Sequence, residues 1–302
     1  MMKMPSPPKK NISGPKPRWL IRQLPGKPEY EMIRGMISRS GLHTVCQEAR
    51  CPNQFECFSN KTATFLILGS RCTRNCAFCA VAHGQPEPPD ISEPAKVADA
   101  AQKMGLRYVV VTSVTRDDLA DGGAGIFVQT IREIRKKMPR ACVEVLIPDF
   151  QGDFSALKTV LNAEPDVLNH NMETVRRLYP PVRPQAFYGR SLELIRRVKK
   201  YRPGIPAKSG IMLGLGETEA EIAEVLKDLR TAGCDFLTMG QYLQPSDAHL
   251  PVQRYVPPEE FELWKNKAGE AGFRQVASGP FVRSSYHAGD MYREGRLETF
   301  TD

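Results

Sequence analysis

Residues 64–80 read TFLILGSRCTRNCAFCA, a short apolar run followed by three cysteines. The run 64–68 predicts a buried strand, and Cys72, Cys76 and Cys79, here called the first trio, fall within eight residues of the loop behind it. Thiolates spaced this closely point to different sides of a tight loop, so they do not pair easily as disulfides. They can converge on one iron–sulfur cluster, because thiolates are its usual ligands. Three ligands leave one iron of a four-iron cube open to an exogenous molecule.

A zinc site is the alternative interpretation of the first trio. Zinc sites usually combine paired Cys-x-x-Cys motifs or cysteine and histidine knuckles. Only one such pair, Cys76 and Cys79, is present in this stretch, and the five histidines of the chain show no metal-ligand spacing. We therefore favour an iron–sulfur cluster.

A second trio precedes this stretch. Cys46, Cys51 and Cys57 lie within twelve residues, and no strand pattern runs through them, so we expect a loop or a loose turn that binds a second cluster. The remaining Cys142 and Cys234 lie in or beside apolar strands and are expected in the core.

The chain then alternates between strand and helix patterns. Strands are expected at 64–68, 108–114, 142–147, 167–171, 208–215 and 236–243, and helices at 95–104, 126–138, 154–162, 192–201, 219–232 and 259–270. Such alternation predicts a parallel sheet with right-handed crossovers. Six units are too few for an eight-fold barrel. A doubly wound sheet is not supported, because the first strand lacks a Gly-x-Gly-x-x-Gly motif.

We therefore expect an α/β fold built as a partial (β/α)6 TIM-type barrel, with an added edge strand at 274–278 and extensions at both ends. Composition divides the chain into a basic, proline-rich arm (1–28), an N-terminal extension with the second trio (29–61), the barrel (62–272) and a C-terminal extension (273–302). The arm holds seven Lys or Arg residues, seven prolines and no acid, so it accounts for all but one of the net +8 charges. We expect an extended, solvated arm, with attraction to an acidic protein or to nucleic acid as the alternatives.

Polar residues interrupt several of the expected strands. In a barrel these side chains should face the lumen, where either a bound ligand or a paired structural network satisfies them. They are Glu144, Asn169, Asn171, Lys208 and Gln241. Near the other end of the chain, Ser284 and Ser285 are either weak, displaceable iron ligands or a helix N-cap, and the residues alone favour the cap.

The first trio, with Phe78 before its last cysteine, resembles the motif of the radical S-adenosylmethionine superfamily. The segment GIMLGLGE at 210–217 resembles the glycine-rich segment of that superfamily that contacts adenine. The resemblance implies that the open iron chelates the amino and carboxylate groups of S-adenosylmethionine. It also implies cofactor-binding roles for Phe78, Glu144, Asn171, Lys208 and Gly214.

A narrower resemblance is to the lipoyl synthase family, and it covers about residues 18–288. It rests on the Cys-x4-Cys-x5-Cys spacing of the second trio, on RSSY at 283–286, and on the segments 112–118, 144–150 and 179–190. By the family pattern, Ser285 joins Cys46, Cys51 and Cys57 as ligands of an auxiliary 4Fe–4S cluster, with Ser284 as the fallback. This reverses the preference for a helix cap. The implied reaction inserts two sulfur atoms from that cluster at carbons 6 and 8 of an octanoyl chain, amide-linked to a lysine of a lipoyl carrier domain.

The resemblance also implies partners. They are octanoylated carrier domains (2-oxoacid dehydrogenase acyltransferase subunits and the glycine cleavage H protein), an electron donor such as flavodoxin or ferredoxin, and an iron–sulfur carrier that rebuilds the cluster. We expect a monomer with no nucleic-acid or membrane partner. No apolar run approaches the ~18 residues of a membrane span, and eight cysteines without a secretory pattern indicate a reducing compartment, the cytoplasm.

Two other functions stay open at this point. A radical methylthiotransferase acting on RNA would suit the basic arm, but it leaves RSSY unexplained and would need an RNA-binding domain after residue 280. A non-catalytic iron–sulfur electron carrier is the other possibility. Six strand–helix units with polar residues in the strands make a larger fold than such a carrier requires.

Overall fold

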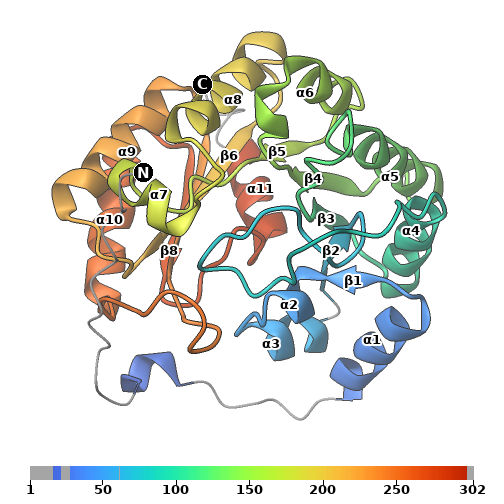
Figure 1. The fold of residues 1–302 in the computed structure, drawn as a ribbon, viewed down its shortest axis with the longest axis horizontal. Helices are drawn as coiled ribbons and strands as arrows, with labels where there is room; N and C mark the ends of the chain where they lie inside the picture. Colours follow the sequence, from blue (N-terminus) through green and yellow to red (C-terminus); the bar gives the residue numbers. More distant parts are fainter. Residues whose placement is uncertain (1–15, 22–27, 61, 298–302) are drawn as a thin grey trace.

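The barrel is an open sheet of eight strands in the order β1 to β8 (Figure 1). The structure is a computed structural model that describes residues 16–21, 28–60 and 62–297. Strands β2 to β8 are parallel, whereas the two-residue β1 runs antiparallel to β2. The strands are β1 (His43–Thr44), β2 (Thr64–Ile67), β3 (Tyr108–Ser113), β4 (Cys142–Leu146), β5 (Val167–Asn169), β6 (Ala207–Leu213), β7 (Phe236–Gln241) and β8 (Gln275–Gly279). This confirms the six predicted strands, the edge strand and the partial-barrel class.

The main helices cover the outer face of the sheet. They are α4 (Glu93–Met104), α5 (Ala124–Lys137), α6 (Phe154–Leu161), α8 (Tyr188–Tyr201), α9 (Glu219–Thr231) and α10 (Pro258–Glu270). Each buries one apolar stripe, as Phe127, Ile131 and Ile134 do on α5. Thr218 and Glu221 form a capping box at the start of α9, with both of its hydrogen bonds present. None of the helices in the described ranges is long and apolar enough to cross a membrane.

The second trio was expected in a loop or a loose turn, and this prediction was wrong for Cys46 and Cys57 but not for Cys51. After α1 (Pro28–Arg39), Cys46 lies in α2 (Val45–Glu48) and Cys57 lies in α3 (Gln54–Ser59), with Cys51 in the turn between them. The side chain of Thr44 caps α2 by accepting a hydrogen bond from the backbone N–H of Gln47. Helices of four and six residues complete too few turns to leave a periodic pattern.

A last helix, α11 (Ala288–Leu297), was not predicted, and it lies at the centre of the barrel in Figure 1. Its Met291 and Tyr292 are buried against Val167 and Phe236, the first residues of β5 and β7. The helix therefore closes the N-terminal ends of the strands and leaves their C-terminal ends for the site. Shorter elements are η1 (Arg18–Leu20), η2 (Phe150–Gly152), η3 (Arg176–Leu178) and α7 (Tyr179–Val182).

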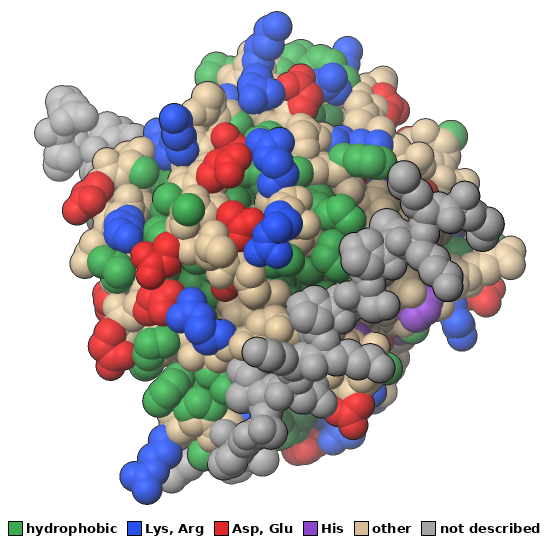
Figure 2. Space-filling view, turned by 60° about the vertical axis from the view of Figure 1, so that its left-hand side comes forward, with side chains coloured by type: hydrophobic (Ala, Val, Ile, Leu, Met, Phe, Trp, Pro, Cys, Tyr) green, Lys and Arg blue, Asp and Glu red, His purple; other side chains and the backbone are tan. Residues whose placement is uncertain are grey.

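The outer surface mixes charges of both signs. Figure 2 shows Lys and Arg side chains interspersed with Asp and Glu on the face that it presents. Exposed ion pairs such as Arg177–Glu221 and Arg254–Glu260 join neighbouring elements. Pairs of this kind contribute little to stability. The basic arm lies mostly outside the described residues.

Candidate active site

Both cysteine trios line one cavity of about 1020 Å³ inside the barrel. Ser284 and Ser285, from the far end of the sequence, line it as well. The structure therefore brings together every metal-ligand candidate that the sequence indicated. Of the other two cysteines, Cys234 is buried as expected, whereas Cys142 is only half-buried at the start of β4.

The cysteine loop, residues 69–80, is fastened from several sides. Cys72 Sγ accepts hydrogen bonds from the backbone N–H groups of Arg74 (3.4 Å) and Thr115 (3.3 Å). The carbonyl oxygen of Cys79 lies 3.1 Å from Nε2 of His249, in the loop after β7. The ligand geometry is thus set by loops that follow different strands, where parallel α/β folds place their functional groups.

Burial makes the thiols costly to ionise. It raises the pKa of Cys79 to about 12, and it raises the pKa of Cys76 even though Arg183 opposes the shift. The pKa of Cys46 in the second trio is also raised by burial. Thiolates at these positions need compensating positive charge, which bound iron supplies. The donor set therefore fits metal clusters.

The choice between a cluster and zinc rests on the ligand types. Within the described ranges, no group of three His, Cys, Asp or Glu side chains lies close enough to hold a single metal ion. Three thiolates with a single Cys-x-x-Cys pair are more typical of an iron–sulfur cluster than of a zinc site.

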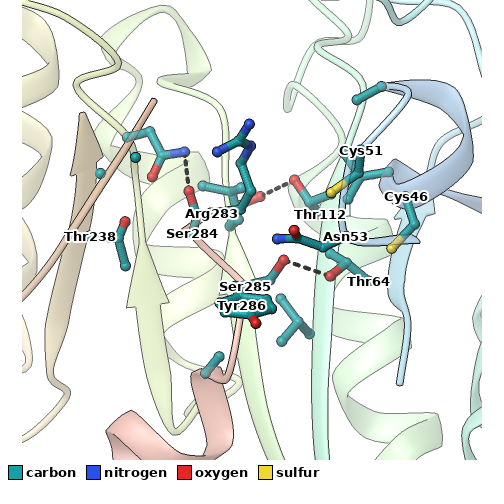
Figure 3. A pocket seen from close by; sticks show the side chains of 18 of the residues that line it. Cys46, Cys51, Asn53, Thr64, Thr112, Thr238, Arg283, Ser284, Ser285 and Tyr286 are labelled. Carbon is teal, nitrogen blue, oxygen red and sulfur yellow. Dashed lines mark hydrogen bonds between the residues drawn. The ribbon is translucent and has the colours of Figure 1, made fainter. Parts of the chain in front are cut away.

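The C-terminal strap, residues 280–287, carries the serines across the barrel interior. Ser285 Oγ accepts a 2.7 Å hydrogen bond from Thr64 Oγ1 on β2 (Figure 3). Tyr286 Oη donates to Glu56 Oε1 (2.8 Å), and Asn53 Nδ2 donates to the carbonyl oxygen of Phe281 (2.7 Å). Since Glu56 lies on α3 and Asn53 directly before it, the strap is held next to the second trio.

Glycines on β6 and β7 make room for the strap. A Cβ added to Gly240 would overlap the carbonyl oxygen of Val282, and one on Gly210 would lie 3.2 Å from Ser284 Oγ. Ser284 Oγ also accepts a 2.6 Å hydrogen bond from Asn171 Nδ2. Gly210, which the resemblance placed in an adenine-contact segment, therefore faces the strap.

The remaining cavity wall offers unsatisfied polar atoms. Asn171 Oδ1, Arg183 Nε, Ser113 Oγ and Asn53 Oδ1 line the cavity and are buried without a hydrogen-bond partner in the structure as described. Buried polar groups are normally paired, so four orphans on one wall fit a polar ligand.

Sequence reasoning missed Arg183 and Glu173 on this wall. Burial raises the pKa of Glu173 although the Arg183 guanidinium opposes the shift. Glu173 lies four residues after β5, and a charged residue just past a strand end is the signal that could have identified it. Arg183 follows the short helix α7 and has no such signal.

The cofactor-binding candidates divide into two groups. Phe78 and Asn171 line the cavity, whereas Glu144, Lys208 and Gly214 do not. Lys208 Nζ donates to both oxygens of Glu144 (2.9 and 3.1 Å), and each of these two side chains is 1% exposed. They form the paired network that was the alternative to ligand binding.

Neighbouring groups complete this network. Tyr108 Oη (2.6 Å) and Asn169 Nδ2 (3.2 Å) donate to Glu144. Gln241 is likewise satisfied, because it bonds backbone groups that include the N–H of Val256. Gly214 is packed against Gln241, with no room for a side chain.

Comparison with known proteins agrees with this geometry. A protein-family model of the Radical SAM superfamily matches residues 66–229. Lipoyl synthase from Desulfotalea psychrophila is 59% identical over 93% of this chain and 94% of its own length. Lipoyl synthase from Syntrophotalea carbinolica is 58% identical over 94% of this chain and 92% of its own length.

Solved structures share the fold at low identity. Streptococcus suis SuiB bound to S-adenosylmethionine matches with a TM-score of 0.54 at 10% identity, over 82% of this chain and 60% of that chain. Methylornithine synthase matches with a TM-score of 0.51 at 13% identity, over 91% of this chain and 94% of that chain. These likenesses show the fold, while the sequence relatives show the family. The chain belongs to the lipoyl synthase family of the Radical SAM superfamily.

Proposed function

We propose that this chain is a sulfurtransferase that inserts two sulfur atoms at carbons 6 and 8 of an octanoyl chain, carried as an amide on a lysine of a lipoyl carrier domain. One observation carries the proposal: the two cysteine trios and Ser285 line a single cavity. A radical generator and a sulfur source must face the same substrate carbon, and this arrangement provides both in one chamber.

The chain would hold three groups there. The first trio holds a 4Fe–4S cluster that keeps one open iron, and Cys46, Cys51, Cys57 and Ser285 hold the auxiliary 4Fe–4S cluster. When bound, the first cluster and S-adenosylmethionine supply a radical able to take hydrogen from an unactivated carbon, and the auxiliary cluster supplies sulfur. No side-chain base could deprotonate such a carbon, so the chemistry must come from these groups.

The residues of the wall bind and orient the cofactor. The Arg183 guanidinium is suited to a carboxylate, since Arg183 lines the cavity and its buried Nε has no hydrogen-bond partner among the described residues. Asn171 and Glu173 offer an amide oxygen and a carboxylate to amino or hydroxyl groups. Phe78 adds an apolar surface beside the first trio.

The strap and α11 exclude water from the reaction. The strap crosses the lumen, and α11 lines the cavity from the N-terminal ends of the strands. A reactive radical requires such shielding from side reactions. Ser285 is a hard and weak ligand for iron, so it suits a cluster that must give up sulfur.

The partners follow from this chemistry. The chain needs an octanoylated carrier domain as substrate, a one-electron donor such as flavodoxin or ferredoxin, and an iron–sulfur carrier to restore the auxiliary cluster. We place this activity in the cytoplasm, where a monomer with reduced thiols can load its clusters.

An anaerobic assay tests the function. The protein with both clusters is incubated with reductant, S-adenosylmethionine and an octanoyl-lysine peptide. We expect 5′-deoxyadenosine and a peptide that has gained two sulfur atoms. Cleavage of S-adenosylmethionine without sulfur transfer, while both clusters remain intact, would contradict the proposal. Absence of 5′-deoxyadenosine would favour the electron carrier, and transfer of a methylthio group to RNA would favour the methylthiotransferase.

A further inference from the structure

We propose that Arg74 is a positioning residue that sets the reduction potential of the cluster held by the first trio, against the opposing charges of Asp117 and Asp149. This rests on the proposed function, which places a redox-active cluster at Cys72, Cys76 and Cys79.

The buried Arg74 side chain forms ion pairs with two carboxylates, those of Asp117 and Asp149. Its Nε and one Nη donate to the two oxygens of Asp117 at 2.6 and 2.9 Å, and the same Nη donates to Asp149 Oδ1 at 2.6 Å. The Arg74 side chain is 5% exposed and that of Asp149 is fully buried. A planar guanidinium satisfies two carboxylates at once in this way, which lysine cannot do.

The carboxylates tie Arg74 to the sheet. Asp117 follows β3 and Asp149 follows β4, so the cysteine loop is fixed to the C-terminal ends of two neighbouring strands. Asp149 Oδ2 also accepts a 3.3 Å hydrogen bond from Arg190 Nη1 on α8. The network is therefore rigid and belongs to the scaffold.

The next residue strengthens this attachment. Thr73 Oγ1 donates to the carbonyl oxygen of Thr115 (2.9 Å) and accepts from the N–H of Asp117 (3.1 Å). The backbone N–H groups of Thr115 and Arg74 in turn donate to Cys72 Sγ. Arg74 thus acts on the cluster through charge and through the placement of one ligand sulfur.

Such an arrangement bears on electron transfer. The potential of an iron–sulfur cluster depends on nearby charge, on hydrogen bonds to its sulfurs and on solvent exposure. Reduction adds a negative charge to the cluster, so the guanidinium favours the reduced form and the carboxylates favour the oxidised form. In a buried site these fixed charges are weakly screened.

Paired substitutions give opposite signs. Arg74→Gln removes the positive charge that faces the two carboxylates and should lower the potential, whereas Asp149→Asn removes a negative charge and should raise it. We expect the reduction equilibrium of the first cluster to shift about tenfold in each direction, the effect of one nearby charge on a buried equilibrium. Arg74→Lys keeps the charge and should shift it less than Arg74→Gln.

The measurement is a redox titration of the cluster-loaded protein followed by electron paramagnetic resonance. The signal that changes on addition of S-adenosylmethionine identifies the cluster of the first trio. Arg196→Gln is the matched control, because Arg196 forms an exposed ion pair with Glu193 on α8 and should leave the potential unchanged. Iron content shows whether each variant keeps its clusters.

Opposite shifts in Arg74→Gln and Asp149→Asn support the proposal. Shifts of the same sign, or unchanged potentials with the cluster retained, overturn it and leave Arg74 a structural residue. If Arg74→Gln loses the cluster, the test rests on Asp149→Asn alone. A raised potential in that variant supports the proposal, and an unchanged potential overturns it. The wild-type sulfur-insertion assay tests the proposed function separately, because its outcome does not depend on these variants.

Discussion

Thr64 and Ser285 share a 2.7 Å hydrogen bond although 221 positions separate them in the chain. The bond joins the first parallel strand of the barrel to the C-terminal strap. Thr64 also lies next to the second trio on the cavity wall. One hydroxyl therefore fixes the place of the only oxygen ligand proposed for the auxiliary cluster.

We expect Thr64→Val to loosen the auxiliary cluster. The substitution keeps the shape of a buried side chain and removes the donor to Ser285 Oγ, at a cost of about 1 kcal/mol. The rate of auxiliary iron loss to a chelator should rise about fivefold, while the cluster of the first trio is retained. Thr64→Ser should restore the wild-type rate, and equal rates in Thr64→Val would show that the bond does not position the ligand.

Replacing Ser285 by cysteine should hold the auxiliary cluster more firmly. A thiolate is a softer and stronger ligand for iron than a hydroxyl group. Ser285→Cys should therefore retain the auxiliary cluster but transfer sulfur more slowly, with initial cofactor cleavage unaffected. Product peptide and 5′-deoxyadenosine are measured from the same reaction. Unchanged sulfur transfer would argue against release of the serine as a required step.

Adding one methyl group at Gly240 should displace the strap. A Cβ there would overlap the carbonyl oxygen of Val282, so Gly240→Ala must move the strap and Ser285 with it. We expect loss of the auxiliary cluster with the first cluster intact, read by iron content and Mössbauer spectroscopy. Gly269→Ala is the control, because a Cβ there meets no neighbouring atom within 4 Å. Full auxiliary occupancy in Gly240→Ala would mean that the strap tolerates the shift.

The free energy of unfolding should fall as the pH is lowered from 6.5 to 4, because His170 is buried in its neutral form. Burial lowers the pKa of His170 from 6.5 to about 4, while one ring nitrogen bonds the Ile147 carbonyl and the other bonds Ser191 Oγ. Between pH 6.5 and pH 4, His170 is protonated in the unfolded chain but neutral in the folded chain. The free energy of unfolding therefore decreases by up to about 3 kcal/mol as the pH falls through this window.

The variant His170→Gln isolates this effect. It cannot titrate, so its unfolding free energy should change less between pH 6.5 and pH 4 than that of the wild-type protein. Both proteins are unfolded with urea in parallel, so that acid effects on other groups cancel. Identical pH slopes would show that His170 is accessible to protons in the folded state.

Glu144→Gln tests whether Glu144 and Lys208 form a structural ion pair instead of binding the cofactor. Breaking a buried ion pair leaves an uncompensated charge and costs about 3–5 kcal/mol. The loss should appear in unfolding, and Glu144→Gln combined with Lys208→Met should recover much of it. Binding of S-adenosylmethionine, measured by equilibrium dialysis on the folded protein, should stay within about twofold of wild type, since neither residue lines the cavity. A selective loss of S-adenosylmethionine binding in the folded variant would show that Glu144 contributes to the cofactor site.

The barrel could be predicted because its elements leave patterns in consecutive residues. The β2 residues 64–67 are buried on both faces and read as a largely apolar run, and the α9 stripe repeats over two turns. The cysteines that line the cavity could be predicted because a rare residue recurs at short spacing. Such signals are local, and they survive without knowledge of the tertiary structure.

The rest could not be predicted because it depends on contacts between distant segments. In α11, the buried positions Ala288, Met291, Tyr292 and Gly295 recur at helical spacing, but two of the four are the small residues Ala and Gly, so the sequence shows only a weak apolar stripe. Glu144 and Lys208 looked like ligand-binding residues because their pairing crosses from β4 to β6. The role of Gly240 becomes visible only when Val282 lies against it.

The strap has a consequence for biosynthesis. During translation, both trios and the first strand leave the ribosome long before Ser285 is made. A nascent chain at that stage presents six cysteines but lacks the serine, the anchors between the strap and α3, and the helix that closes the barrel. The ligand set proposed for the auxiliary cluster is therefore complete only after the whole barrel segment has been synthesised, so we expect that cluster to be loaded after Ser285 has left the ribosome.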